Sequence, residues 1–180
     1  MRNAKVCAAV AALILAAAAG LTAVATTPRA RWRTATADEL RRVVPARAPV
    51  IKENIETEFR TASGVIDGRG RYIAGVVMIT AGYSAEGKYS HFFLTQVPLR
   101  VGELELPAGQ YVFGYARAGD DAIRVSFYRA TTGDHVGDAE ARRSTRKGTG
   151  VRSLLINPPA AGRANLQIGR FLLEYRVADQ

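Results

Sequence analysis

The amino-acid sequence predicts an all-β fold, an antiparallel β-sandwich, over residues 61–180. Turn signals recur about every 8–12 residues, and the segments between them are rich in Val, Ile, Phe and Tyr. Prolines fall between these segments, where they do not interrupt the hydrogen bonds of a sheet. No segment in this region keeps a helical period over several turns. The same pattern fits a closed barrel, so the sequence leaves sandwich and barrel as alternatives.

Residues 1–25 are typical of a signal peptide. Arg2 and Lys5 form a positive start, Val6 to Ala19 is an unbroken apolar run, and Ala23 and Ala25 have the small-x-small spacing of a cleavage site. We expect cleavage after Ala25 and therefore a secreted or periplasmic protein.

The alternative is an uncleaved anchor, because residues 6–25 are uncharged and just long enough to span a bilayer. In that case the leader would be the chain's contact with a membrane. The only cysteine, Cys7, lies within the leader. If the leader is cleaved, the mature chain has no cysteine and therefore no disulfide and no thiol chemistry.

Residues 26–60 are interpreted as a linker or a short helix. Thr36 is a candidate N-cap, and Glu39 follows at the spacing of a capping box. Pro45 and Pro49 would end such a helix. The composition of this segment, rich in Arg, Ala, Thr and Pro, fits a basic linker equally well.

The expected extended segments follow one another to the end of the chain. Glycine, proline and aspartate mark the turns between them, notably at 84–87, 117–121 and 131–134. The segments are 63–68, 71–83, 88–99, 100–106, 111–116, 122–130, 135–143, 151–156 and 164–177. In the segment 122–130, alternation places Ile123, Val125 and Phe127 on one face and Arg124 and Tyr128 on the other.

The stretch "LELPAGQYVFGY" is interpreted as a tight turn between two strands. Pro107 fixes φ at the start of the turn, and Gly109 is expected to adopt a positive φ. After the turn, Tyr111, Phe113 and Tyr115 share one face of the second strand.

Three motifs together resemble small exported bacterial β-sandwich domains. They are "LPAGQYVFG", "VSFYRATTG" and the late "INPPAAG…LQIGRFLLEY". The L-P-A-G-x-Y hairpin is also similar, more loosely, to transthyretin-like, carboxypeptidase-regulatory-like and PEGA-type modules. The resemblance implies a noncatalytic accessory or binding role, and it carries over no set of functional residues.

The sequence offers no catalytic constellation, no metal site and no cofactor motif. The serines lack a G-x-S-x-G turn, and no phosphate-binding glycine loop is present. The two histidines, His91 and His135, lie in different segments. In a regular strand His135 would face away from Asp134, Asp138 and Glu140, which argues against a shared metal site.

Two surfaces remain as candidate binding sites. One is a tyrosine-bearing sheet face, because exposed aromatic rings beside polar groups bind sugar rings or partner proteins. The candidates for this face are Tyr128, Arg124, Tyr111 and Tyr115. The other is a basic loop whose backbone and side chains could hold an anion, with candidates Arg142, Arg143, Arg146 and Lys147.

The predicted function is that of a noncatalytic exported module that binds a protein or glycan of the cell envelope. A hydrolase of unfamiliar type and a basic binder of anionic polymers are the alternatives. The net charge of +9 supports the polymer binder, because a basic surface attracts polyanions. Nucleic acid is not the expected partner, because many exported proteins are basic without binding a specific polyanion.

Overall fold

The computed structural model describes residues 31–146, 148 and 150–178, and most of them lie in antiparallel β-strands. The predicted signal peptide lies outside the described residues. In the part of the chain that is described, no helix has the length and apolar character needed to cross a membrane. The elements are β1 (Arg33–Thr34), α1 (Ala37–Arg41), β2 (Arg47–Val50), β3 (Glu53–Ile66), β4 (Tyr72–Met78), β5 (His91–Thr95), β6 (Leu99–Val101), β7 (Leu104–Leu106), β8 (Gly109–Arg117), β9 (Ala122–Arg129), β10 (His135–Arg143), β11 (Arg152–Ile156), β12 (Arg163–Gly169) and β13 (Phe171–Val177).

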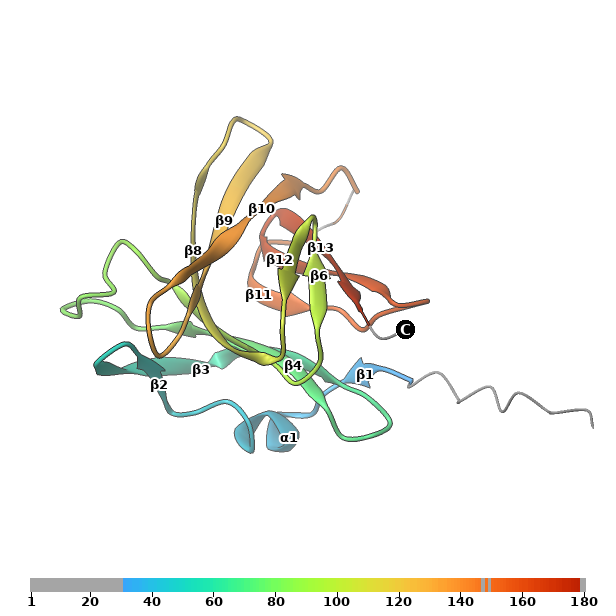
Figure 1. Cartoon of the computed structure of the whole chain (residues 1–180). Coiled ribbons are helices and arrows are strands. Elements are labelled where there is room, and N and C mark those ends of the chain that lie inside the picture. Colours follow the sequence, from blue (N-terminus) through green and yellow to red (C-terminus); the bar gives the residue numbers. More distant parts are fainter. Residues whose placement is uncertain (1–30, 147, 149, 179–180) are drawn as a thin grey trace, which may run out of the picture.

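The strands form one strongly curled antiparallel sheet (Figure 1). Its order is β1-β3-β4-β5-β8-β9-β10-β13-β12-β11, with β2 beside β3 and the β6–β7 hairpin beside β13. The curl brings β11 back against β3, where the Ile156 amide donates to Ser63 Oγ at 2.8 Å. The all-β prediction is therefore confirmed, whereas a sandwich of two separate sheets is not, because the main path of strands is continuous.

Ordered structure begins earlier than the predicted boundary at residue 61. The capping box is present, with Thr36 accepting from the Glu39 amide and the Glu39 carboxylate accepting from the Thr36 amide. This helix is a single turn, and β2 and the first half of β3 follow it within the expected linker. The start of β3 was missed because its residues 53–60 are mostly polar, with only Ile55 fully buried among them.

Apolar side chains are buried on both faces of the sheet. The inner cluster, inside the curl, includes Phe93, Phe113 and Phe127. The outer cluster lies on the opposite face, where α1 and β2 cover β3, β4 and β5 through residues such as Leu40 and Val50. The segment "YIAGVVM" is apolar on both faces for this reason, because β4 lies between the two clusters.

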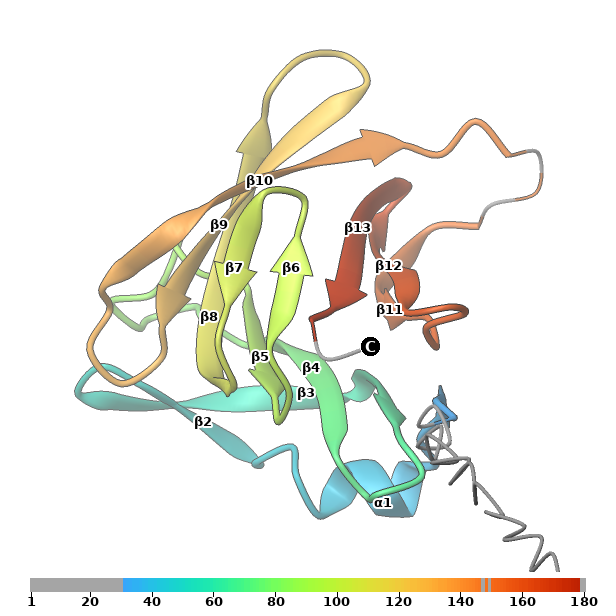
Figure 2. The same cartoon turned by 45° about the vertical axis from the view of Figure 1, so that its right-hand side comes forward.

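The β6–β7 hairpin fills a gap in the sheet. β10 pairs with β13 only at Arg142 and Arg143, and beyond that point the two strands diverge. The hairpin lies between them, pairing with β13 and placing Leu104 against Gly137 of β10 (Figure 2). Its tight turn is at Gly102, which has a φ of +58° that favours glycine.

The predicted turn at Gly109 is wrong. Gly109 is the first residue of β8 and does not have a positive φ. β7 and β8 do not pair with each other, because β8 lies between β5 and β9. Pro107 and Ala108 instead form a corner that leads the chain from the hairpin into the main sheet.

The last expected segment, 164–177, is two strands instead of one. A turn at Gly169, with a φ of +61°, separates β12 from β13. β11, β12 and β13 then form the C-terminal part of the sheet, with Leu166 and Leu173 facing the inner cluster. Their other face, which carries Asn165, Gln167 and Glu174, is polar and borders the candidate site.

His91 is a buried polar residue that ties β5 to β11. Its ring stacks on Phe113 with centroids 4.6 Å apart, and only 3% of the residue is exposed. Nδ1 lies 2.8 Å from Ser90 Oγ, and Nε2 lies 3.3 Å from the Ser153 carbonyl oxygen. Burial lowers the pKa of His91 from 6.5 to about 4, so the imidazole is neutral at pH 7.

Candidate functional site

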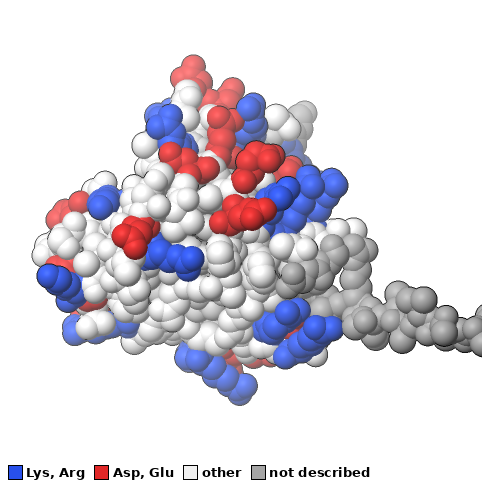
Figure 3. Space-filling model, in the orientation of Figure 1, with Lys and Arg blue, Asp and Glu red and all other residues white. Residues whose placement is uncertain are grey.

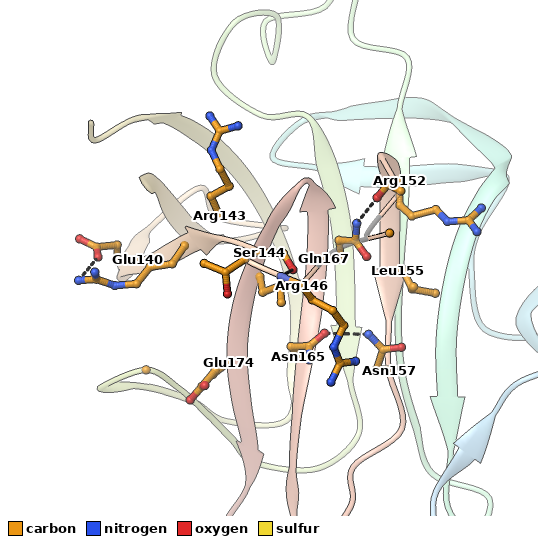
Figure 4. Close-up of a pocket in the computed structure, with 16 residues that line it drawn as sticks. Glu140, Arg143, Ser144, Arg146, Arg152, Leu155, Asn157, Asn165, Gln167 and Glu174 are labelled. Carbon is orange, nitrogen blue, oxygen red and sulfur yellow. Dashed lines mark hydrogen bonds and ion pairs between the residues drawn. The ribbon is translucent and has the colours of Figure 1, made fainter. Parts of the chain in front are cut away.

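A polar groove lies where β10 meets β11, β12 and β13, beneath the loop that joins β10 to β11. Its volume is about 930 Å³. Side chains from four strands and the loop line it, and Figure 4 shows them converging from different directions. The lining residues are Gly102, Glu140, Arg142, Arg143, Ser144, Thr145, Arg146, Gly148, Gly150, Arg152, Leu155, Asn157, Asn165, Gln167, Leu172 and Glu174.

Amide side chains form one wall of this groove. Asn157 donates from Nδ2 to Asn165 Oδ1 at 2.8 Å, across the turn between β11 and β12. Gln167, which is almost fully buried, donates to the carbonyl oxygens of Gly150 at 2.6 Å and Gly169 at 2.8 Å. The Gln167 contact fixes the end of the loop against β12, so this wall is held by hydrogen bonds.

Arginines surround the groove, but they differ in what they contact. Arg142 pairs with Glu140 at 2.7 Å, and Arg143 points away from the groove and pairs with Asp121 at 2.8 Å (Figure 4). Arg152, at the start of β11, is exposed, and its side chain forms no ion pair or hydrogen bond with any described residue.

Arg146 extends toward the Asn157–Asn165 pair in Figure 4. Of the residues predicted to form a basic loop, Arg142 and Arg143 lie at the end of β10 and Arg146 in the loop after it. All three line the groove, but the side chain of Arg143 points away from it. Lys147 lies outside the described residues. Anion binding by this loop stays a prediction.

The four residues predicted for a tyrosine-bearing face do not share one face. Tyr111 is fully buried in the inner cluster, where its hydroxyl donates to the Pro107 carbonyl oxygen at 2.5 Å. Tyr115 is on the same face of β8, and it is 50% exposed because it lies near the end of the strand, beyond the core. Tyr111 is thus excluded from a surface site, since alternation gives the face of a residue but not its depth.

Tyr128 and Arg124 do lie on the outer face, opposite Ile123, Val125 and Phe127, as alternation predicted. The Tyr128 ring is partly buried. Its centroid is 5.0 Å from that of Tyr89 and 5.1 Å from that of His135. The ammonium of Lys88 lies 5.2 Å from the Tyr128 centroid. These contacts hold the ring in place beside two polar groups.

His135 and Asp138 are on the same face of β10, which corrects the prediction from a regular strand. A β-bulge between His135 and Gly137 shifts the register against β9, so that the alternation restarts after Gly137. His135 Nε2 lies 2.9 Å from Asp138 Oδ1. Hydrogen bonds from Ser126 and, to a smaller extent, from His135 lower the pKa of Asp138.

This cluster lacks the arrangement of nucleophilic catalysis. Both Ser126 and His135 bond to the Asp138 carboxylate, and among the described residues no hydrogen bond joins Ser126 to His135. No group of three or more His, Cys, Asp or Glu residues is placed to hold a metal ion within residues 31–146, 148 and 150–178.

Sequence reasoning missed the amide wall of the groove. Asn157 is separated from Asn165 by two prolines and a turn, and no local signal shows that these two side chains meet. Comparison of the chain with protein-family models, curated proteins and solved structures found no match to any of them.

Proposed function

We propose that this protein is an exported, noncatalytic module of the β-sandwich type that binds an acidic glycan of the cell envelope in the groove between the β10–β11 loop and the C-terminal strands. The leader pattern of residues 1–25 supports export. The curl of the sheet, which brings β11 against β3 around the inner cluster, supports a relation to sandwich modules, in which two layers of strands enclose one core.

The observation that carries this proposal is the combination of arginines and amides around one groove. An acidic sugar presents a carboxylate or phosphate together with several hydroxyl groups. Guanidinium groups such as that of Arg152 suit the charged group. The amides of Asn157 and Asn165 and the carboxylates of Glu140 and Glu174 suit hydroxyl groups, since they donate to or accept from them.

The same observations argue against nucleic acid. Among the described residues that line the groove, there is no aromatic side chain on which a base could stack. On the face of the molecule drawn in Figure 3, basic and acidic side chains are interspersed and do not form a continuous basic stripe.

A binding measurement with defined polymers tests the proposal. We expect the protein to bind polygalacturonate, an acidic polysaccharide, more tightly than dextran, a neutral one, and the binding to weaken as salt is added. An Arg152→Gln variant should lose about threefold to tenfold in affinity for polygalacturonate. Arg69→Gln is the matched control, because Arg69 is exposed in the β3–β4 turn and does not line the groove.

Two results would contradict the proposal. One is equal binding of the acidic and neutral polymers. The other is an Arg152→Gln variant that binds polygalacturonate as tightly as the Arg69→Gln control. Both arginines are exposed, so neither substitution is expected to change the fold, which circular dichroism checks.

A further inference from the structure

The groove continues into a row of polar side chains on the outer face of β9 and β10. Glu140 and Arg142 line the groove and also belong to β10. The register of the two strands places Arg142 opposite Ala122, and Glu140 opposite Arg124. Further along the row, Asp138 lies opposite Ser126, and His135 lies opposite Tyr128.

The bulge at Gly137 makes this row continuous. In a regular strand His135 would face the opposite side from Asp138, and the row would end there. With the bulge, His135 contacts Asp138 and also packs beside Tyr128. At a rise of about 3.3 Å per residue, the row extends about 20 Å beyond Arg142.

The side chains of the row are accessible. The exposed fractions are 51% for His135, 42% for Asp138 and 49% for Glu140. Tyr128 is partly buried and held by its neighbours, so a contact with its exposed part would cost little conformational entropy.

Cations recur along this path. Arg152 lies in the groove, Arg124 in the middle of the row, and Lys88 at its far end beside Tyr128. Arg124 is exposed, and among the described residues its guanidinium forms no ion pair, although its charge contributes to the lowered pKa of Asp138. Between these cations, Ser126, Asp138 and His135 offer groups that bind hydroxyls. A chain with a repeated acid group and hydroxyls between the acids matches this order.

We infer that the ligand is a glycan chain and not a single acidic sugar, and that it runs from the groove along the outer face of β9 and β10 to Tyr128 and Lys88. This inference rests on the proposed function, since the groove is where the chain would begin. It assigns Arg124 and Lys88 to successive acid groups of the ligand, and Asp138 and Ser126 to its hydroxyls.

The experiment compares a short and a long oligomer of galacturonate. Wild type should bind the long oligomer more tightly than the short one, which the groove alone accommodates. An Arg124→Gln, Lys88→Gln double variant should lose about fivefold in affinity for the long oligomer and keep its affinity for the short one. The matched control is Arg42→Gln with Arg69→Gln, since these exposed arginines lie on the side of α1 and the β3–β4 turn, away from β9 and β10 (Figure 1).

The outcomes separate the inference from the proposed function. If Arg152→Gln weakens binding of both oligomers but the Arg124, Lys88 double variant behaves like its control, the groove stands and the extended path is rejected. If wild type binds neither oligomer, or Arg152→Gln has no effect on either, both are rejected. Equal affinity of wild type for the two oligomers also overturns the extended path.

Discussion

Lowering the pH from about 7.5 to about 5 should destabilise this protein by about 2 kcal/mol through one side chain, His91. The buried imidazole accepts a hydrogen bond from Ser90 at Nδ1 and donates one from Nε2 to the Ser153 carbonyl, which can only accept. A second proton would have to bind at Nδ1, and it would place a positive charge on a buried ring that stacks on Phe113.

The magnitude follows from the pKa of His91, which is about 4 in the folded protein and 6.5 when the imidazole is exposed to water, as in the unfolded chain. Between these values the unfolded chain binds a proton that the folded protein does not bind. The stability is therefore complete above pH 6.5 and falls as the pH drops toward 4. The full shift corresponds to about 3 kcal/mol, and about 2 kcal/mol of it is lost by pH 5.

Urea unfolding at the two pH values measures this loss. The comparison stops at about pH 5 so that carboxyl groups do not add to the loss. The fold lowers the pKa values of Glu39 and Asp67, and these residues stop stabilising the folded protein only as the pH falls below the ordinary carboxyl range. A His91→Gln variant should be less stable at pH 7.5, but its stability should change about 2 kcal/mol less between the two pH values.

Arg69→Gln, a substitution of an exposed residue in the β3–β4 turn, is the control and should leave the decrease of the wild type in place. The reasoning is refuted if His91→Gln keeps the full decrease of the wild type, or if the wild type is equally stable at both pH values.

Three further substitutions test the fold by urea unfolding. Gly114→Ala would place a Cβ 2.1 Å from the backbone oxygen of Lys88 and should lower the free energy of unfolding by about 2–3 kcal/mol. Gly68→Ala is the control, because its Cβ would meet nothing within 4 Å, and it should lower the free energy of unfolding by less than about 1 kcal/mol. Similar losses in the two variants would contradict the close approach at Gly114. Gly137→Ala should cost about 1–2 kcal/mol, because its Cβ would lie 2.6 Å from a leucine methyl of β7, and an unchanged midpoint would contradict the packing of the bulge. Thr36→Ala should cost about 1 kcal/mol through loss of the capping box, and Thr36→Ser should restore most of it; an equal loss in both variants would contradict the cap.

The binding site depends on contacts between segments that are far apart in the sequence. Asn157 and Asn165 meet only because β11 and β12 pair, and Gln167 reaches the loop only because that loop returns over β12. The sequence did indicate a cluster of arginines near residues 142–152, since these charges are local. It gave no indication that amides would lie beside them.

Local patterns alone determined the strand content, the capping box at Thr36 and the outward side of Tyr128, because each depends on spacing within one segment. Only the tertiary structure decided the depth of Tyr111, the bulge that brings His135 to Asp138, and the single curled sheet. The physical reason is that alternation assigns a side chain to a face, whereas burial and register depend on which strand lies beside it. The bulge at Gly137 shifts the pairing of β10 with β9, and Leu104 of β7 packs beside it. The sequence of β10 alone identifies neither of these neighbouring strands.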